Sequence, residues 1–106
     1  MTSAPHPRHR LSEVIHQPVR FSIVAALAAA DSLDFRTIRD AVQVSDSVLS
    51  KQLSVLSDAE IVEIRKGFVG KWPRTWVKLT DSGRVSWLGH IDTLQEIATS
   101  TPDTDS

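Results

Sequence analysis

The chain has 106 residues, the length of a single domain, and its 41% hydrophobic and 24% charged residues match the averages of soluble globular domains. It contains no cysteine, which excludes disulfide bonds, thiolate metal sites and cysteine nucleophiles, and its net charge is −1. The longest apolar run, at residues 23–30, is too short to span a membrane.

Both ends of the chain are polar. Residues 1–10 contain two prolines and two histidines, and residues 99–106 contain only Ser, Thr, Asp and Pro. We therefore predict disordered tails at residues 1–10 and 99–106 and one folded domain at residues 11–98. Because residues 1–10 also lack the apolar segment of a secretory signal, we expect a cytoplasmic protein.

The first part of the domain has the periodicity of helices. Residues 11–16 predict a short helix with apolar residues on one side. Residues 19–30 predict a second helix, and Pro18 suits its first position because that position needs no N–H donor. The pair Asp31-Ser32 ends this helix.

Two further helices follow, joined by the short turn Gln43-Val44. Asp34 is a good N-cap for a helix at residues 35–42, and Ser45 for a helix that ends near Asp58 or Ala59. The buried face of the later helix is marked by three leucines at helical spacing, Leu49, Leu53 and Leu56. Two helices in this arrangement form a helix-turn-helix, whose second helix can enter the DNA major groove.

The outer face of that second helix is suited to DNA. Opposite the leucines it carries small hydroxyl side chains and one lysine, namely Ser47, Ser50, Lys51 and Ser54. Small hydroxyls allow close approach to base edges, and Lys51 can reach a guanine or a phosphate. An ordinary amphipathic surface helix has the same polar face, so this pattern alone leaves both interpretations open.

The periodicity then changes to that of a strand. Residues 61–66 and 75–80 predict two strands, and residues 67–74, with two glycines and Pro73, predict the loop between them. The segment is basic, and Lys66, Lys71 and Arg74 gather near its tip. A basic hairpin after a helix-turn-helix is the layout of a wing that follows the DNA backbone or minor groove. A hairpin that is merely solvated is the alternative.

A last helix is predicted at residues 82–98, capped by Thr80 or Asp81. It has more apolar surface than a small core can cover, and the helix at residues 11–16 has the same excess. Pairing of these terminal helices across a two-fold axis would bury both sets. The residues that we expect in such a homodimer interface are Leu11, Val14, Ile15, Trp87, Ile91 and Leu94.

Two segments together resemble winged-helix transcriptional regulators of the ArsR and MarR type. The first runs from Leu33 through the predicted recognition helix to Val62, and the second is the segment at residues 70–84, with its Pro-Arg-Thr and Leu-Thr-x-x-Gly-Arg motifs. The resemblance covers residues 18–84. It implies a fold that is mainly α with a small β-hairpin, a winged helix-turn-helix. Glu60 departs from the family, which often has glycine there.

The resemblance also implies a homodimeric DNA-binding regulator, in most cases a repressor, whose partner is a pseudo-palindromic double-stranded operator. The DNA-binding residues that we predict are Ser45, Asp46, Ser47, Ser50, Lys51, Ser54, Lys66, Lys71 and Arg74. The alternative is a winged helix that docks onto another protein. Catalytic motifs are absent from the sequence, so we expect neither an enzyme nor a cofactor.

A metal-sensing regulator is a third hypothesis, and it finds little support in the sequence. His90 and Asp92 are two residues apart and so point to different faces of a helix, and His6 and His9 lie in the predicted tail. Such scattered ligands do not form a closed coordination set. We therefore predict no metal site.

Overall fold

The computed structural model describes residues 5–100 and 102. In chain order its elements are η1 (Pro7–Arg10), α1 (Glu13–His16), α2 (Pro18–Ala28), β1 (Leu33–Asp34), α3 (Phe35–Val42), α4 (Asp46–Asp58), β2 (Val62–Val69), β3 (Trp72–Leu79) and α5 (Asp81–Thr99). The predicted fold class, mainly α with a small hairpin, is confirmed.

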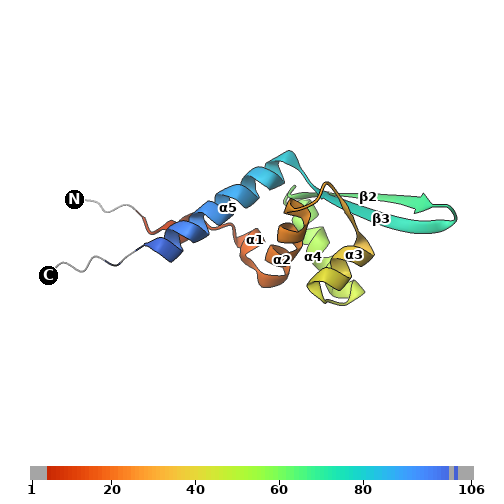
Figure 1. The fold of residues 1–106 in the computed structure, drawn as a ribbon, viewed down its shortest axis with the longest axis horizontal. Coiled ribbons are helices and arrows are strands. Elements are labelled where there is room, and N and C mark those ends of the chain that lie inside the picture. The colour runs from red at the N-terminus through yellow and green to blue at the C-terminus, as the bar shows by residue number, and fades with distance from the viewer. Residues whose placement is uncertain (1–4, 101, 103–106) are drawn as a thin grey trace.

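The helices gather around the base of a small antiparallel sheet with strand order β1-β3-β2. Figure 1 shows that the β2–β3 hairpin extends beyond the helices on one side, whereas α5 runs away from its base on the other. The core lies between these parts, and its fully buried side chains come from α1 to α4 and from β3: Ile15, Ile23, Val24, Leu27, Ile38, Leu49, Leu56 and Val77. The leucine stripe predicted for α4 therefore does face the core.

The helix-turn-helix begins and ends as the sequence predicts, because its signals are local. The Asp34 carboxylate accepts a hydrogen bond from the Thr37 amide at 2.7 Å, and the Ser45 hydroxyl accepts one from the Val48 amide at 3.2 Å. Each bond satisfies one of the free N–H groups of a helix start. Between the two helices Gln43 takes a left-handed conformation with φ of 57° and ends α3.

Glu60, where the resembling family often has glycine, also has a left-handed conformation, with φ of 61°. The Ile61 amide donates to the Leu56 carbonyl at 2.9 Å, and the Glu60 amide donates to the Ser57 carbonyl at 2.9 Å. These two bonds form a Schellman motif, and the buried Leu56 and Ile61 supply its apolar contact. The turn therefore has the left-handed backbone conformation that glycine usually provides, although the residue is a glutamate.

The wing is longer than predicted. Residues 67–74 were expected to be a loop, but β2 and β3 pair from Val62↔Leu79 to Val69↔Trp72, and only Gly70 and Lys71 form the turn. Gly70 has φ of 61°, which glycine accommodates without strain. Pro73 is tolerated within β3 because β1 pairs only with Trp76 and Val77, which leaves one edge of the distal half of β3 free.

The start of α5 packs against the turn that follows α4. The Thr80 hydroxyl donates to the Glu60 carbonyl at 2.6 Å and accepts from the Gly83 amide at 2.8 Å, so it caps α5 as predicted. A Cβ atom on Gly83 would overlap the carbonyl group of Ile61. The Leu-Thr-x-x-Gly motif thus has two structural roles. Its threonine caps α5, and its glycine lets α5 pack closely against the backbone of Ile61.

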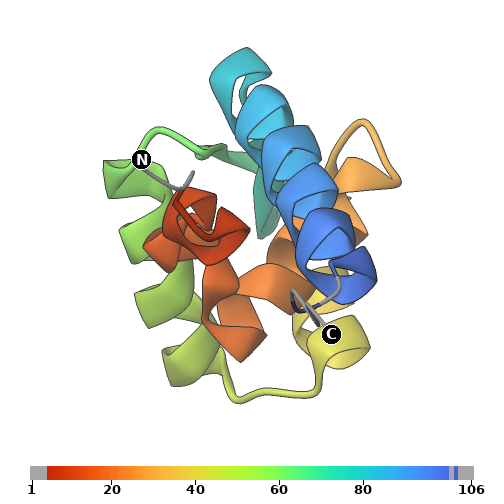
Figure 2. The ribbon, with the colours of Figure 1, turned by 90° about the vertical axis from the view of Figure 1, so that its left-hand side faces the viewer.

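The N-terminal segment that the sequence predicts to be a tail contains a short 3-10 helix. Residues 7–10 form η1, which packs along α5, and Arg10 forms an ion pair with Glu96. In Figure 2 this red segment lies beside the blue helix α5. These residues contact α5, and no local sequence pattern reveals this neighbour. The predicted tails at residues 1–4, 101 and 103–106 lie outside the described residues.

The first two helices are also shorter than predicted, because α1 starts at Glu13 rather than at residue 11 and α2 ends at Ala28 rather than at residue 30. Among the described residues, no helix combines the length and apolar character needed to cross a lipid bilayer.

One of the predicted dimerisation residues lies in the core. Ile15 is fully buried in the core, and Val14 and Trp87 pack against that core. Ile15 is therefore not available to an interface, because the periodicity that marks an interface also marks a core, whereas Val14 and Trp87 are only half-buried. The other three candidates, Leu11, Ile91 and Leu94, are half-buried and lie outside the core cluster.

Candidate nucleic-acid interface

The outer face of α4 is the first part of the candidate interface. All six α4-region residues predicted to contact DNA are exposed, namely Ser45, Asp46, Ser47, Ser50, Lys51 and Ser54. The Ser45 hydroxyl is partly occupied, because it caps the helix and lies 3.3 Å from the Ser47 hydroxyl. The remaining side chains present hydroxyl groups, one ammonium and the Asp46 carboxylate to a partner that lies along the helix.

A groove joins α4 to the wing. About 450 Å³ in volume, it is lined by four of the predicted residues, Asp46, Ser50, Ser54 and Lys66, together with Phe35, Leu53, Ile64 and Thr75. Lys66 lies on the wing strand β2, so tertiary structure brings it beside the hydroxyls of α4. Helix and wing are therefore two walls of one continuous surface.

A second groove of about 590 Å³ lies between the start of α3, the start of α4 and the wing. It holds Asp46 and Arg74, which the sequence predicted, and also Arg36 and Arg39 of α3, which it did not. Arg39 donates to Asp46 at 3.0 Å and to Asp40 at 3.0 Å. These bonds raise the pKa of Arg39, with the Asp46 bond as the larger cause, and they compensate the carboxylate that would otherwise repel phosphates.

Arg74 does not project freely from the wing. Its guanidinium lies 3.6 Å from the Asp34 carboxylate and 5.8 Å from the centre of the Trp76 ring, and the side chain is partly buried. The arginine therefore braces the wing against the start of α3, while its exposed part still borders the second groove.

The two lysines of the distal wing and Lys51 differ from the basic residues that are held in ion pairs, such as Arg39 and Lys78. Among the described residues, Lys51, Lys66 and Lys71 make no ion pair, and all three are exposed. By contrast, Arg84 donates to the Ala28 carbonyl at 3.3 Å. Three of the exposed cations without an ion pair to another described residue are thus positions predicted from the sequence, and Arg36 in the second groove is another that the sequence did not predict.

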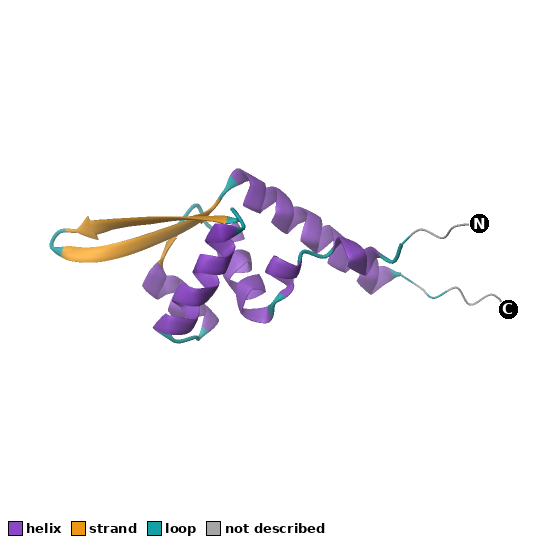
Figure 3. Ribbon diagram, turned by 180° about the vertical axis from the view of Figure 1, so that it is seen from behind, coloured by secondary structure: helices purple, strands orange, loops and turns teal. Residues whose placement is uncertain are grey.

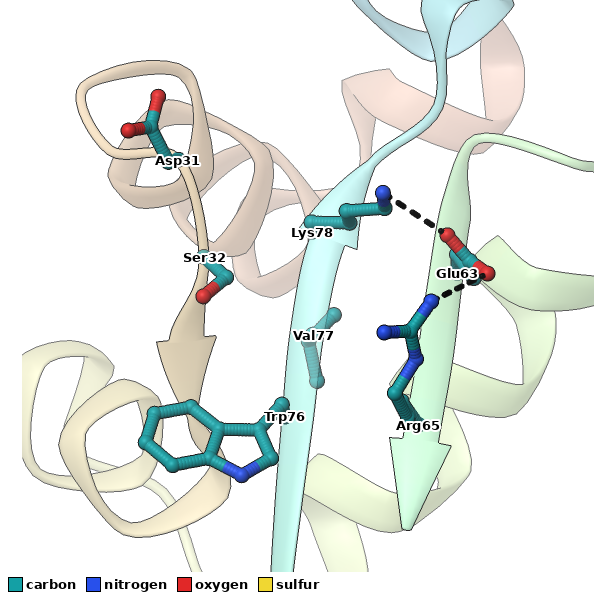
Figure 4. Close-up of a pocket in the computed structure, with 7 residues that line it drawn as sticks. All are labelled: Asp31, Ser32, Glu63, Arg65, Trp76, Val77 and Lys78. Atoms are coloured by element: carbon teal, nitrogen blue, oxygen red, sulfur yellow. Dashed lines mark ion pairs between the residues drawn. The ribbon is translucent and has the colours of Figure 1, made fainter. Parts of the chain in front are cut away.

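The opposite face of the hairpin is electrostatically balanced. A hollow of about 510 Å³ lies there, and one of its lining residues, Glu63, is 3.3 Å from Lys78 and 3.6 Å from Arg65. Figure 4 shows Glu63 between these two side chains. Glu63 is thus shared by two of the basic residues of this segment, and Asp31, which lines the same hollow, supplies a second negative charge on this face. The positive charge that remains is on the side of the wing that borders α4 and at the tip.

Sequence reasoning missed Arg36 and Arg39. Both lie on the polar side of α3, the first helix of the helix-turn-helix, and this position could have marked them as candidates for DNA contact. Only the tertiary structure shows that this side borders the wing. No group of three potential metal ligands gathers within the described part of the chain.

The fold and these grooves define a winged helix-turn-helix domain. The sequence pattern of the winged helix DNA-binding domain family matches residues 19–98, and the chain belongs to that family. The resemblance inferred from the sequence is therefore confirmed.

One relative is similar in sequence and two solved structures are similar in fold. An uncharacterized protein of Methanocaldococcus jannaschii is 25% identical over 79 residues, which cover 74% of this chain and 86% of the relative. The transcriptional regulator homologue of Pyrococcus horikoshii has a TM-score of 0.78 at 24% identity, covering 82% of this chain and 86% of that one. A MarR-family transcriptional regulator of Silicibacter pomeroyi has a TM-score of 0.59 at 20% identity, covering 94% and 69%.

Proposed function

We propose that this protein is a sequence-specific transcriptional regulator that binds double-stranded DNA in the cytoplasm. The observation that supports this most directly is the groove between α4 and the wing, where Ser50 and Ser54 face Lys66. The α4 side chains would contact base edges in the major groove, and the wing would contact the backbone and the adjacent minor groove. The other predicted contacts, Ser45, Asp46, Ser47, Lys51, Lys71 and Arg74, belong to the same proposal.

The regulator would act as a homodimer and a repressor. Support for the homodimer comes from α5, where Val85 is 71% exposed and Leu88 is 58% exposed, beside the half-buried Ile91. An apolar helix face of this kind is typical of an interface between copies. Two protomers would place their recognition helices in successive major grooves, about 34–36 Å apart, on a pseudo-palindromic operator.

Selection of bound duplexes from a random DNA pool tests this function. We expect an enriched inverted repeat whose half-site spacing matches one helical turn, and an affinity for it that falls steeply with salt. Recovery of no common sequence, with binding that is weak and equal for all duplexes, would contradict the proposal and favour protein docking through the wing.

A further inference from the structure

The wing tip exposes large apolar side chains. Phe68 is 74% exposed and Trp72 is 76% exposed, and Val69 beside them is also exposed. Figure 3 shows the hairpin tip at the opposite end of the molecule from the end of α5, and Figure 1 shows it extending past the helices. The described part of the chain therefore leaves these rings exposed to solvent. Exposed rings do not stabilise the core, so their presence at the tip indicates a binding role.

The two rings lie on opposite faces of the hairpin. Phe68 pairs with Pro73 across the ladder, whereas Trp72 pairs with the neighbouring Val69. Directly paired residues share one face and successive residues alternate, so Phe68 and Trp72 project in opposite directions. The tip is thus a thin ribbon that is apolar on both sides, which differs from a sheet face that continues the core.

Positive charge surrounds this apolar tip. The ten residues from Lys66 to Thr75 include three basic side chains and no acidic one. Lys66 and Lys71 make no ion pair among the described residues, and Lys66 also lines the groove beside α4. A partner that fits this tip combines anionic groups on its surface with apolar surface between them.

The minor groove of DNA has this combination. Phosphates line its edges, and the sugars and base edges within it accept apolar side chains, which several minor-groove binders insert between base steps. Continuity with the α4 groove favours DNA over an anionic lipid surface, because Lys66 already belongs to both the wing and that groove.

We propose that the wing tip is an apolar wedge that enters the minor groove and bends the duplex, with Trp72 and Phe68 packed against sugars and a partly unstacked base step. This inference rests on the proposed function and extends it. The wedge would favour a flexible pyrimidine–purine step at its position, since such steps unstack most easily.

The test uses the full chain and the duplex that the random pool returns. Binding is measured against salt concentration, and bending is measured by energy transfer between dyes at the two duplex ends. Trp72→Ala/Phe68→Ala should lose about tenfold in affinity at fixed salt, keep the salt slope and reduce the bend. Lys71→Ala is the matched control, which should lower the salt slope by about one unit and leave the bend unchanged. Trp72→Phe should retain most of the bend.

Three results would overturn the wedge. If the double variant binds and bends the duplex as the wild type does, the wedge is wrong and the regulator function stands. If the wild type selects no sequence and bends no duplex, the proposed function and the wedge both fail. If the wild type sediments with phosphatidylglycerol vesicles, selects no DNA and loses vesicle binding in the double variant, the tip is a lipid-binding element instead. A thermal unfolding curve of each variant checks that the exposed substitutions leave the fold intact.

Discussion

Arg74 of the wing lies 3.6 Å from Asp34, the residue that caps α3. The same carboxylate therefore performs two tasks, since its other oxygen accepts the hydrogen bond from the Thr37 amide. Hydrogen bonds from Thr37, and to a lesser extent the charge of Arg74, lower the pKa of Asp34. One side chain thus links the start of the helix-turn-helix to the wing.

Two substitutions of Asp34 separate its tasks. Asp34→Asn keeps an amide oxygen for the cap and removes the charge, so we expect a loss of stability of at most about 1 kcal/mol. Asp34→Ala also removes the cap and should cost about 1 kcal/mol more. Urea unfolding of both variants measures these free energies. Equal losses for the two variants would show that the cap contributes nothing.

Lys51 and Lys71 should differ in the kind of DNA contact that they make. Lys51→Ala should weaken binding to the selected operator by about 1–3 kcal/mol and relax the preference at one base pair. Lys71→Ala should weaken specific and random duplexes equally. Lys78→Ala is the control, because Lys78 is paired with Glu63 on the other face. If the first two variants bind the operator like the wild type, α4 and the wing are not the DNA surface.

The exposed apolar residues of α5 should hold the proposed dimer together. Leu88→Asp places a charge on that face, so light scattering at micromolar concentration should give half the wild-type mass, and operator affinity should fall. Ser86→Asp adds the same charge to an exposed position on a different side of α5 and should remain dimeric. A wild type that is monomeric at these concentrations would contradict the dimer.

The two glycines of α5 should respond oppositely to alanine. Gly83→Ala should destabilise the fold by about 1–3 kcal/mol, because the added methyl group overlaps the Ile61 carbonyl. At Gly89 a Cβ meets no atom within 4 Å, so Gly89→Ala should stabilise the helix by up to about 1 kcal/mol. Thermal unfolding of the two variants checks the difference. A stable Gly83→Ala protein would mean that α5 does not dock closely at Ile61.

His90 should make stability depend on pH. Its ring is 2% exposed, and its Nδ1 accepts a hydrogen bond from the Ser12 amide at 3.1 Å. Burial, and secondarily the nearby His16, lower the pKa of His90 below the ordinary value of 6.5. The unfolded chain therefore binds a proton more readily than the folded one, so stability is fully present above about pH 6.5 and falls as the pH decreases below that value.

Urea unfolding between pH 5 and pH 7 measures this dependence. His90→Leu should flatten the curve, because no proton can then be taken up at that position. His9→Gln, which changes an exposed histidine, should leave the slope as it is. An unchanged slope in His90→Leu would assign the dependence to other groups.

Much of the helix-turn-helix follows from short-range chemistry. Asp34, Ser45 and Thr80 each cap a helix by accepting a hydrogen bond from the amide three residues further on, so the sequence itself contains both partners of each bond. The leucine stripe of α4 likewise determines its inward face, and hence the outward position of Ser50 and Lys51. Periodicity also predicted the order of the helices and strands, and the family resemblance added that they form a winged helix.

Contacts between distant residues decided the rest. Gly67 and Pro73 have the composition of a loop, and only pairing along two whole strands places them in a ladder. Ile15 and Leu11 look alike in sequence, yet Ile15 is buried in the core because α2 and α4 pack around α1, whereas Leu11 lies outside it. The Asp34–Arg74 pair and the groove that Lys66 shares with α4 join residues that only tertiary packing brings together. Local hydrogen-bonding groups thus determined where the helices begin and which way they face, while the burial of apolar surface between separated segments determined what the wing and the terminal helices contact.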